Sequence, residues 1–173
     1  MKNNLSINKD ILIRARKIKL LLMDCDGVLT DGRLYYSEIG EALKVFNVRD
    51  GQGIVSWHQA GFQSGIISGR DAKKILEVRA TELGMHYIKT RSHDKARDFF
   101  DILQDSKVSL EEVAYIGDDI GDICLMGKVG LPVAVADAVS ELLPQVIYVT
   151  KAKGGCGAVR EITDLLLSAK EIL

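Results

Sequence analysis

The chain has 173 residues, an apolar fraction of 47% and a formal net charge of -1 at neutral pH. A chain of this length encloses a sizeable core without disulfides or structural metal, so we expect a single domain over residues 1–173. The small net charge gives no reason to expect nucleic acid or an anionic membrane as a partner. Residues 1–17 lack the apolar run of an export signal, and no segment is long and apolar enough to cross a bilayer, so we expect a cytoplasmic protein.

Short apolar runs alternate with segments of helical periodicity along most of the chain. After an amphipathic helix over residues 8–16, strands are expected at 19–23, 63–67, 85–88, 113–116, 131–135 and 146–149. Helices are expected at 53–60, 71–83, 94–104, 120–129, 139–142 and 158–172. This alternation is typical of the α/β class, here a Rossmann-like parallel sheet with helices on both faces.

One segment, at about residues 31–46, does not fit the alternation. Residues 34–36 and 43–46 are rich in strand-forming side chains, and a turn at 39–41 separates them. We therefore expect a protruding β-hairpin. The other connections are too short for a cap domain, and residues 151–173 form a glycine-rich C-terminal tail.

Acidic residues follow two of the expected strands. Asp24 and Asp26 come directly after the first apolar run, and a Gly-Asp-Asp sequence at 117–119 follows the strand at 113–116. Ligands of an open parallel sheet bind outside the carboxyl ends of its strands, so both groups can meet in one pocket. Carboxylates that close together repel one another and require a cation, and hard oxygen ligands favour Mg²⁺.

Each acidic motif alone is as well explained by turn chemistry, because Asp and Gly are common in loops for backbone reasons. Their occurrence together, at two strand ends and with Lys95 between them, makes that explanation improbable. The sequence Asp-Cys-Asp-Gly-Val-Leu-Thr at 24–30 resembles the signature of the haloacid dehalogenase superfamily, and the other motifs of that superfamily match in order at 68–70, Lys95 and 117–119. Further segments at 47–51 and 154–161 resemble its capless phosphatases of 3-deoxy-D-manno-octulosonate 8-phosphate.

The resemblance implies the roles of the core residues. Asp24 is the nucleophile that forms an aspartyl phosphate, and Asp26 protonates the leaving group and then activates water. Ser68 and Lys95 bind the transferring phosphoryl group. The expected metal ligands are Asp24, the main-chain carbonyl of Asp26, and Asp118, supported by second-shell groups at Thr30, Asp119 and Asp122.

The resemblance also implies a sugar-acid phosphate as the substrate. A guanidinium can bind a carboxylate through two parallel hydrogen bonds, which makes arginines the candidate contacts. Arg79 is equally well explained as a helix-surface residue. The expected substrate-binding residues are Asn47, Arg49, Asp50, Gly51, Gly69, Arg70 and Arg79.

Without a cap, another element must cover the site. In the resembling family four subunits join through their hairpins, so we expect a homotetramer in which a neighbouring subunit completes the active site. The glycines at 154, 155 and 157 are expected to let the tail approach a ligand. Cys156 stands where the resembling family often has a basic residue. Loss of that positive charge would weaken substrate capture; alternatively, Cys156 only fills space as a small side chain.

Three alternatives to hydrolysis of the octulosonate phosphate remain. A nonulosonate 9-phosphate phosphatase would use the same catalytic residues. A non-catalytic oligomerisation module is expected to lack them, yet all are present, and a phosphomutase is expected to need a cap. The implied activity is a Mg²⁺-dependent phosphomonoesterase of lipopolysaccharide precursor synthesis.

Overall fold

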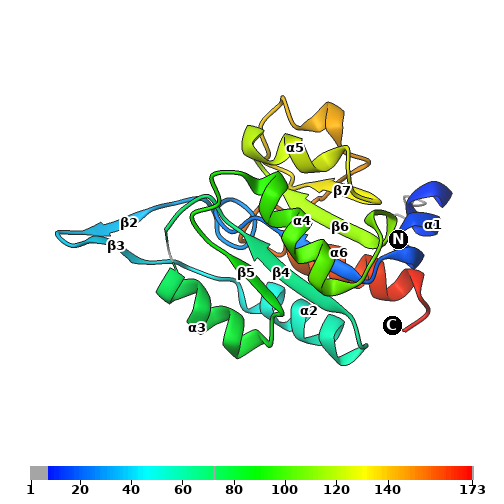
Figure 1. The fold of residues 1–173 in the computed structure, drawn as a ribbon, viewed down its shortest axis with the longest axis horizontal. Coiled ribbons are helices and arrows are strands. Elements are labelled where there is room, and N and C mark those ends of the chain that lie inside the picture. Colours follow the sequence, from blue (N-terminus) through cyan, green and yellow to red (C-terminus); the bar gives the residue numbers. More distant parts are fainter. Residues whose placement is uncertain (1–7, 72, 173) are drawn as a thin grey trace, which may run out of the picture.

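Parallel strands form the centre of the molecule in the computed structural model, which describes residues 8–71 and 73–172 (Figure 1). The described strands of this six-stranded sheet run in the order β5-β4-β1-β6-β7-β8. The order reverses on either side of β1, which pairs with both β4 and β6. The strands are β1 (Leu20–Met23), β4 (Gln63–Ile67), β5 (Tyr87–Lys89), β6 (Val113–Gly117), β7 (Leu131–Ala134) and β8 (Tyr148–Val149).

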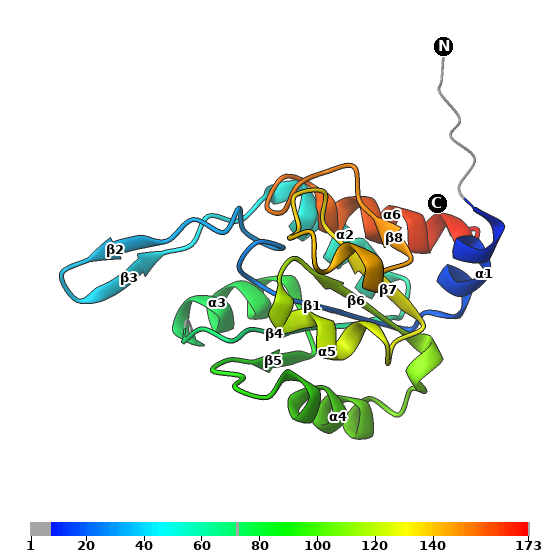
Figure 2. The same ribbon diagram turned by 90° about the horizontal axis from the view of Figure 1, so that it is seen from above.

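Helices cover both faces of this sheet (Figure 2). One core cluster joins the sheet to α1 (Lys9–Lys17), α2 (Val48–Gln59), α3 (Lys73–Leu83) and α6 (Ala158–Ala169). The other cluster joins it to α4 (Lys95–Ser106) and α5 (Ile123–Met126). Successive residues of β1 alternate between the two clusters, as the pleat of a strand requires, so this strand is buried on both faces. The predicted α/β fold class is confirmed.

The predicted hairpin is present and projects away from the body (Figure 1), but its second strand was placed too late in the chain. The antiparallel strands are β2 (Tyr35–Ser37) and β3 (Gly40–Leu43), so the predicted strand at 43–46 is wrong. Gly40 has a φ of 114° and follows a tight turn in which the Ser37 hydroxyl donates to its carbonyl. Residues 44–47 instead return to the body, where Lys44 is buried.

Helix α2 begins at Val48, well before the predicted start at residue 53. Asn47 caps it, since its side-chain oxygen accepts a hydrogen bond from the Arg49 amide at 2.8 Å. The glycines inside this helix permit close packing. A Cβ on Gly53 would lie 2.3 Å from the Thr163 hydroxyl of α6.

Other boundaries also differ from the predictions. The predicted helix at 120–129 is a 3-10 turn (Ile120–Asp122) followed by the short α5. The predicted helix at 139–142 is wrong, because residues 140–142 form a turn that leads into a 3-10 turn at Leu143–Gln145. A further 3-10 turn covers Leu110–Glu112. The prediction for residues 1–17 lies partly outside the described residues, and the single domain over 1–173 stays a prediction. Within the described ranges, no helix has the length and apolar character of a membrane span.

Candidate active site

The acidic motifs follow strands that are neighbours in the sheet. Met23 at the end of β1 is in register with Ile116 of β6 on one side and Ile66 of β4 on the other. Asp24, Asp118 and Ser68, which follow these three strands, therefore meet at one edge, where the strand order reverses. They share a cavity of about 250 Å³ lined by Asp24, Asp26, Ser68, Gly69, Arg70, Lys95, Asp118, Asp119, Gly121 and Asp122.

Lys95 connects two of these carboxylates. Its ammonium lies 2.9 Å from an Asp24 oxygen and 2.7 Å from an Asp122 oxygen. The Asp94 side chain caps α4 by accepting from the Arg97 amide, which fixes the first turn of the helix where Lys95 lies. Burial disfavours the charged lysine, but the two carboxylates outweigh burial and raise the pKa of Lys95.

Asp122 is fully buried and organises the second acidic motif. One of its oxygens accepts from Lys95 and, at 2.7 Å, from the hydroxyl of Tyr115 in β6. The other accepts from the backbone amides of Asp118 at 3.0 Å and Asp119 at 3.3 Å. Asp122 therefore holds the loop after β6 in the conformation that presents Asp118 to the cavity.

The remaining negative charge is concentrated between Asp24 and Asp118. Burial raises the pKa of Asp24. The attraction of Lys95 lowers this pKa and the charge of Asp122 raises it, and the net value is about 6. Burial likewise raises the pKa of Asp118 to about 8, and the charges of Asp24 and Asp122 add to this effect. One Asp118 oxygen is buried without a hydrogen-bond partner in the described structure. The two groups carry more negative charge than the nearby lysine neutralises.

This arrangement fits a divalent cation. Carboxylate oxygens of Asp24, Asp118 and Asp122 lie within 4.8 Å of one another. Hard oxygen donors of this kind suit Mg²⁺. Gly27 leaves room for Asp118, because a Cβ there would lie 2.0 Å from one of its carboxylate oxygens, and its φ of 86° is a left-handed value.

Asp26 is held by residues of the hairpin segment. The Lys44 ammonium donates to one Asp26 oxygen at 2.5 Å and lies 2.7 Å from a Glu41 oxygen. Arg70 approaches the other Asp26 oxygen at 3.8 Å and donates to Glu41 at 3.4 Å. Ionisable groups, among them the buried Lys44, thus surround the second aspartate of the motif.

Ser68 and Gly69 line the cavity as expected. Ser68 is buried, and its backbone amide donates to the Lys89 carbonyl of β5 while its hydroxyl accepts from the Arg70 amide at 3.4 Å. The loop after β4 is therefore fixed by the neighbouring strand, with its hydroxyl at the cavity wall.

Thr30 and Asp119, which we expected to support the metal ligands, lie at different places around the site. The Thr30 hydroxyl is buried in the loop after β1, where it accepts from the amides of Gly27 and Gly32 at 3.4 and 3.2 Å. Asp119 caps the 3-10 turn by accepting from the Ile120 amide at 2.7 Å. Thr30 thus stabilises the loop after β1 and does not line the cavity.

Several expected substrate-binding residues lie elsewhere. Asp50 is buried and accepts from the amides of Gly157 and Arg160, so it caps α6. A Cβ on Gly51 would lie 2.4 Å from the Arg79 guanidinium, which pairs with Glu82 at 2.8 Å. Asn47, Arg49, Asp50, Gly51 and Arg79 are all absent from the lining of the 250 Å³ cavity, whereas Gly69 and Arg70 belong to it.

The glycine-rich tail packs against the loop after β1. A Cβ on Gly154 would lie 1.8 Å from the Gly27 carbonyl oxygen, and the Gly155 amide donates to the Val28 carbonyl at 2.9 Å. The Asn47 side chain donates to the Gly155 carbonyl at 3.0 Å. In the described chain these glycines therefore permit backbone to approach backbone, whereas the sequence led us to expect an approach to a ligand.

Sequence reasoning missed three residues around the site. Tyr115 gave a signal, since a tyrosine in an otherwise apolar strand needs a partner for its hydroxyl. Glu41 and Lys44 gave none, because a charged residue in a hairpin is ordinarily solvated. Only the fold shows that Lys44 is buried.

An open parallel sheet with paired acids after one strand, an acidic loop after its neighbour and a lysine between them is the arrangement expected of a phosphohydrolase. A family model described as haloacid dehalogenase-like hydrolase matches residues 70–162. The 3-deoxy-D-manno-octulosonate 8-phosphate phosphatases of Yersinia pestis and Escherichia coli K12 are 48% and 46% identical over 95% of this chain and 87% of theirs. The chain belongs to the haloacid dehalogenase-like hydrolases.

Solved structures agree with this assignment. The crystal structure of the Yersinia pestis phosphatase superposes with a TM-score of 0.93 at 47% identity, covering 96% of this chain and 90% of that one. The Moraxella catarrhalis phosphatase, solved in complex with a magnesium ion, a phosphate ion and a KDO molecule, gives 0.91 at 34% identity, covering 95% and 94%. The expected family is therefore confirmed, and a magnesium-bound relative supports the expected cofactor.

Proposed function

We propose that this chain is a Mg²⁺-dependent phosphatase that hydrolyses 3-deoxy-D-manno-octulosonate 8-phosphate to the free sugar acid and phosphate. The observation that carries this proposal is the convergence of Asp24, Asp118 and Lys95 at one sheet edge. Relatives of almost equal length that are named for this substrate support its identity. The product would serve lipopolysaccharide precursor synthesis.

In the proposed reaction, an Asp24 oxygen attacks phosphorus as the bond to the leaving sugar oxygen breaks. Asp26 gives its proton to that oxygen and then takes one from the water that cleaves the aspartyl phosphate. Lys95 holds Asp24 and offsets charge on the transferred group, while Ser68 donates to a phosphate oxygen. Asp24, Asp118 and the Asp26 carbonyl would hold the magnesium ion, which lowers the repulsion between the phosphate and the nucleophile.

Arg70 is the expected guanidinium that lines the cavity, and its side chain is 38% exposed. We propose it as the contact for the sugar carboxylate, in preference to Arg49 and Arg79. Arg70→Lys keeps the charge but loses the planar fork, so KM should rise with a smaller change in kcat.

Substitution of the nucleophile tests the reaction. Asp24→Asn should reduce Mg²⁺-dependent phosphate release by roughly a thousandfold or more, because the amide is not a nucleophile. Asp101→Asn removes a carboxylate from α4 whose side chain is 53% exposed, and it serves as the matched control. Full activity of Asp24→Asn would refute the assignment of the nucleophile.

Comparison of substrates tests the specificity. We expect kcat/KM to be higher for the octulosonate 8-phosphate than for a nonulosonate 9-phosphate. The reverse order would replace the proposed substrate with the second sugar acid while leaving the catalytic residues unchanged. Absence of turnover on either, with Mg²⁺ present, would favour the oligomerisation module.

The hairpin supports a homotetramer in which a neighbouring subunit completes the site. Ile39 at its tip is 98% exposed, and Tyr36 and Leu43 are also exposed. An apolar arm of this kind is typical of an association surface. Light scattering should give four copies per particle for the native chain and fewer for Ile39→Glu, and a monomeric native chain would refute the assembly.

We also propose a cytoplasmic location. The cysteines at 25, 124 and 156 are all free, and Cys124 and Cys156 are exposed, which suits a reducing compartment. Fractionation of cells that produce the native chain should recover it in the cytoplasmic fraction. Recovery in another fraction would refute this proposal.

A further inference from the structure

We infer that Lys44, on the segment that returns from the hairpin, positions the carboxylate of Asp26 for proton donation to the leaving group. This inference rests on the proposed function, because it concerns how the proton donor of that reaction is held. Lys44 acts through Asp26 and is a positioning residue.

The burial of Lys44 first indicates a specific role. Its side chain is 1% exposed, although lysines are rarely buried unless they are paired. The ammonium donates to Asp26 Oδ1 at 2.5 Å and lies 2.7 Å from Glu41 Oε1. Removing such a charge from water is costly, and these two carboxylates offset the cost.

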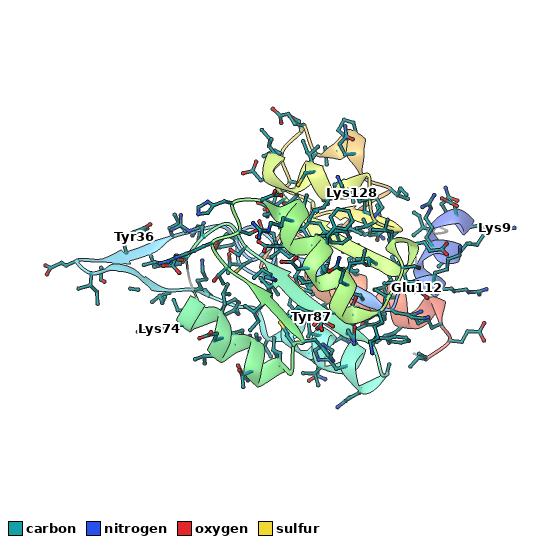
Figure 3. All side chains as sticks on the ribbon, viewed as in Figure 1. Lys9, Tyr36, Lys74, Tyr87, Glu112 and Lys128 are labelled. Atoms are coloured by element: carbon teal, nitrogen blue, oxygen red, sulfur yellow. The ribbon has the colours of Figure 1, made fainter. Side chains whose placement is uncertain are left out.

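The contacts close into a ring. Glu41 Oε2 accepts from Arg70 Nη2 at 3.4 Å, and Arg70 Nε lies 3.8 Å from Asp26 Oδ2. Two cations and two carboxylates thus alternate, and their formal charges cancel while Asp26 is ionised; Asp26 takes up the proton that it donates from solvent or from the attacking water of the preceding turnover. Arg70 also donates to the hydroxyl of Tyr36 at 2.8 Å, which ties the ring to the hairpin strand on which Tyr36 is labelled in Figure 3.

The two oxygens of Asp26 consequently have different surroundings. Oδ1 accepts the short hydrogen bond from Lys44, whereas Oδ2 is buried without a hydrogen-bond partner in the described part of the chain. Because Oδ1 is anchored, the side chain is held in one orientation and Oδ2 is the oxygen left for the substrate. A displacement of about 1 Å in a catalytic group can cost roughly a hundredfold in rate.

Proton donation matters only for some leaving groups. When the phosphorus–oxygen bond to an alkyl sugar breaks, the departing alkoxide is strongly basic and must receive the Asp26 proton. A p-nitrophenolate leaving group is stable without that proton. A ring that merely ties the hairpin to the body predicts the same loss for both kinds of substrate.

The test compares both substrates with Mg²⁺ present. Lys44→Met should lower kcat on the sugar phosphate by roughly 10- to 100-fold and on p-nitrophenyl phosphate by less than about threefold. Lys44→Arg, which keeps a cation, should restore part of the loss. Arg33→Met removes an exposed cation from the same arm and should leave both rates unchanged.

Two further variants keep the inference testable if Lys44→Met folds poorly. Glu41→Gln loosens Lys44 without removing it and should produce a smaller loss with the same preference for poor leaving groups. In an Asp26→Asn background, Lys44→Met should change the sugar-phosphate rate by less than about twofold, because the group it positions is gone. Equal losses on both substrates, or full additivity with Asp26→Asn, would overturn the inference while native turnover still supports the proposed function. A native enzyme inactive on both would overturn both proposals.

Discussion

Magnesium binding should release protons from this site, and the number can be worked from the two acids with raised pKa values. Asp118, with a pKa of about 8, is about nine-tenths protonated at pH 7, and Asp24, at about 6, is about one-tenth protonated. A carboxylate must lose its proton to bind the ion. Binding at pH 7 should therefore release about one proton per chain.

Titration calorimetry in two buffers with different ionisation enthalpies counts the protons directly. The apparent affinity for Mg²⁺ should rise about tenfold per pH unit between pH 6 and 8, and more steeply below pH 6, where Asp24 is protonated as well. Asp119→Asn changes the neighbouring exposed carboxylate and should still release about one proton. An affinity that stays constant from pH 6 to 8, with no proton release, would contradict the crowding of Asp24 and Asp118.

The same pKa values fix the sign of the pH effect on folding without magnesium. Both carboxyl groups have folded-state values above the usual 3.8, so between pH 3.8 and about 8 the folded chain holds more protons than the unfolded chain. The contribution of these groups to the free energy of unfolding must then fall as pH rises through that window. Denaturant unfolding of metal-free protein at pH 5 and pH 8 measures it, with Asp118→Asn as the variant in which the decline is reduced.

Two further substitutions test the packing around the site. Gly154→Ala places a Cβ 1.8 Å from the Gly27 carbonyl oxygen and should lower the free energy of unfolding, measured by denaturant titration, by about 1–3 kcal/mol. Gly127→Ala is the control, because its Cβ meets nothing within 4 Å, and it should change this free energy by less than about 0.5 kcal/mol. Tyr115→Phe removes the buried hydroxyl that donates to Asp122, so we expect a loss of about 1–3 kcal/mol in stability together with a lower kcat. Unchanged stability in Gly154→Ala or Tyr115→Phe would contradict the corresponding contact.

The sheet and the acidic core could be predicted because their signals are local. Apolar runs that end in Asp24 and Asp118 mark both the strands and the edge where ligands bind, and the neighbouring positions of β1 and β6 bring the acids together. Strand boundaries were correct within a few residues in most of the sheet. The catalytic pattern therefore follows from strand order and from residues adjacent in sequence.

The parts that failed depend on contacts between distant segments. The helix expected from residue 53 begins at Val48, and Gly53 lies inside it where α6 approaches closely. The substrate role expected of Asp50 stays a prediction; in the fold its carboxylate caps α6, more than a hundred residues further along the chain. A lysine such as Lys44 in a predicted hairpin strand is ordinarily solvated. Its burial depends on the path that the chain takes as it returns from the hairpin. Such roles depend on contacts between segments that are distant in sequence, and the local pattern of apolar residues does not reveal these contacts.

The distribution of positive charge explains why the site needs a cation at Asp118 and not elsewhere. Lys95 lies between Asp24 and Asp122, and the ring described above balances Asp26 against Lys44. Among the described residues, Asp118 is the acid of this site that has no ion pair of its own; Lys95 only partly offsets the effect of burial, and the pKa of about 8 and the unpartnered buried oxygen reflect this. Replacing it with a neutral residue should relieve the repulsion and stabilise the metal-free fold, since an uncompensated buried charge is costly. That the folded chain retains this carboxyl group is best explained by its use: the free energy that its ionisation costs in the empty site is recovered when magnesium binds.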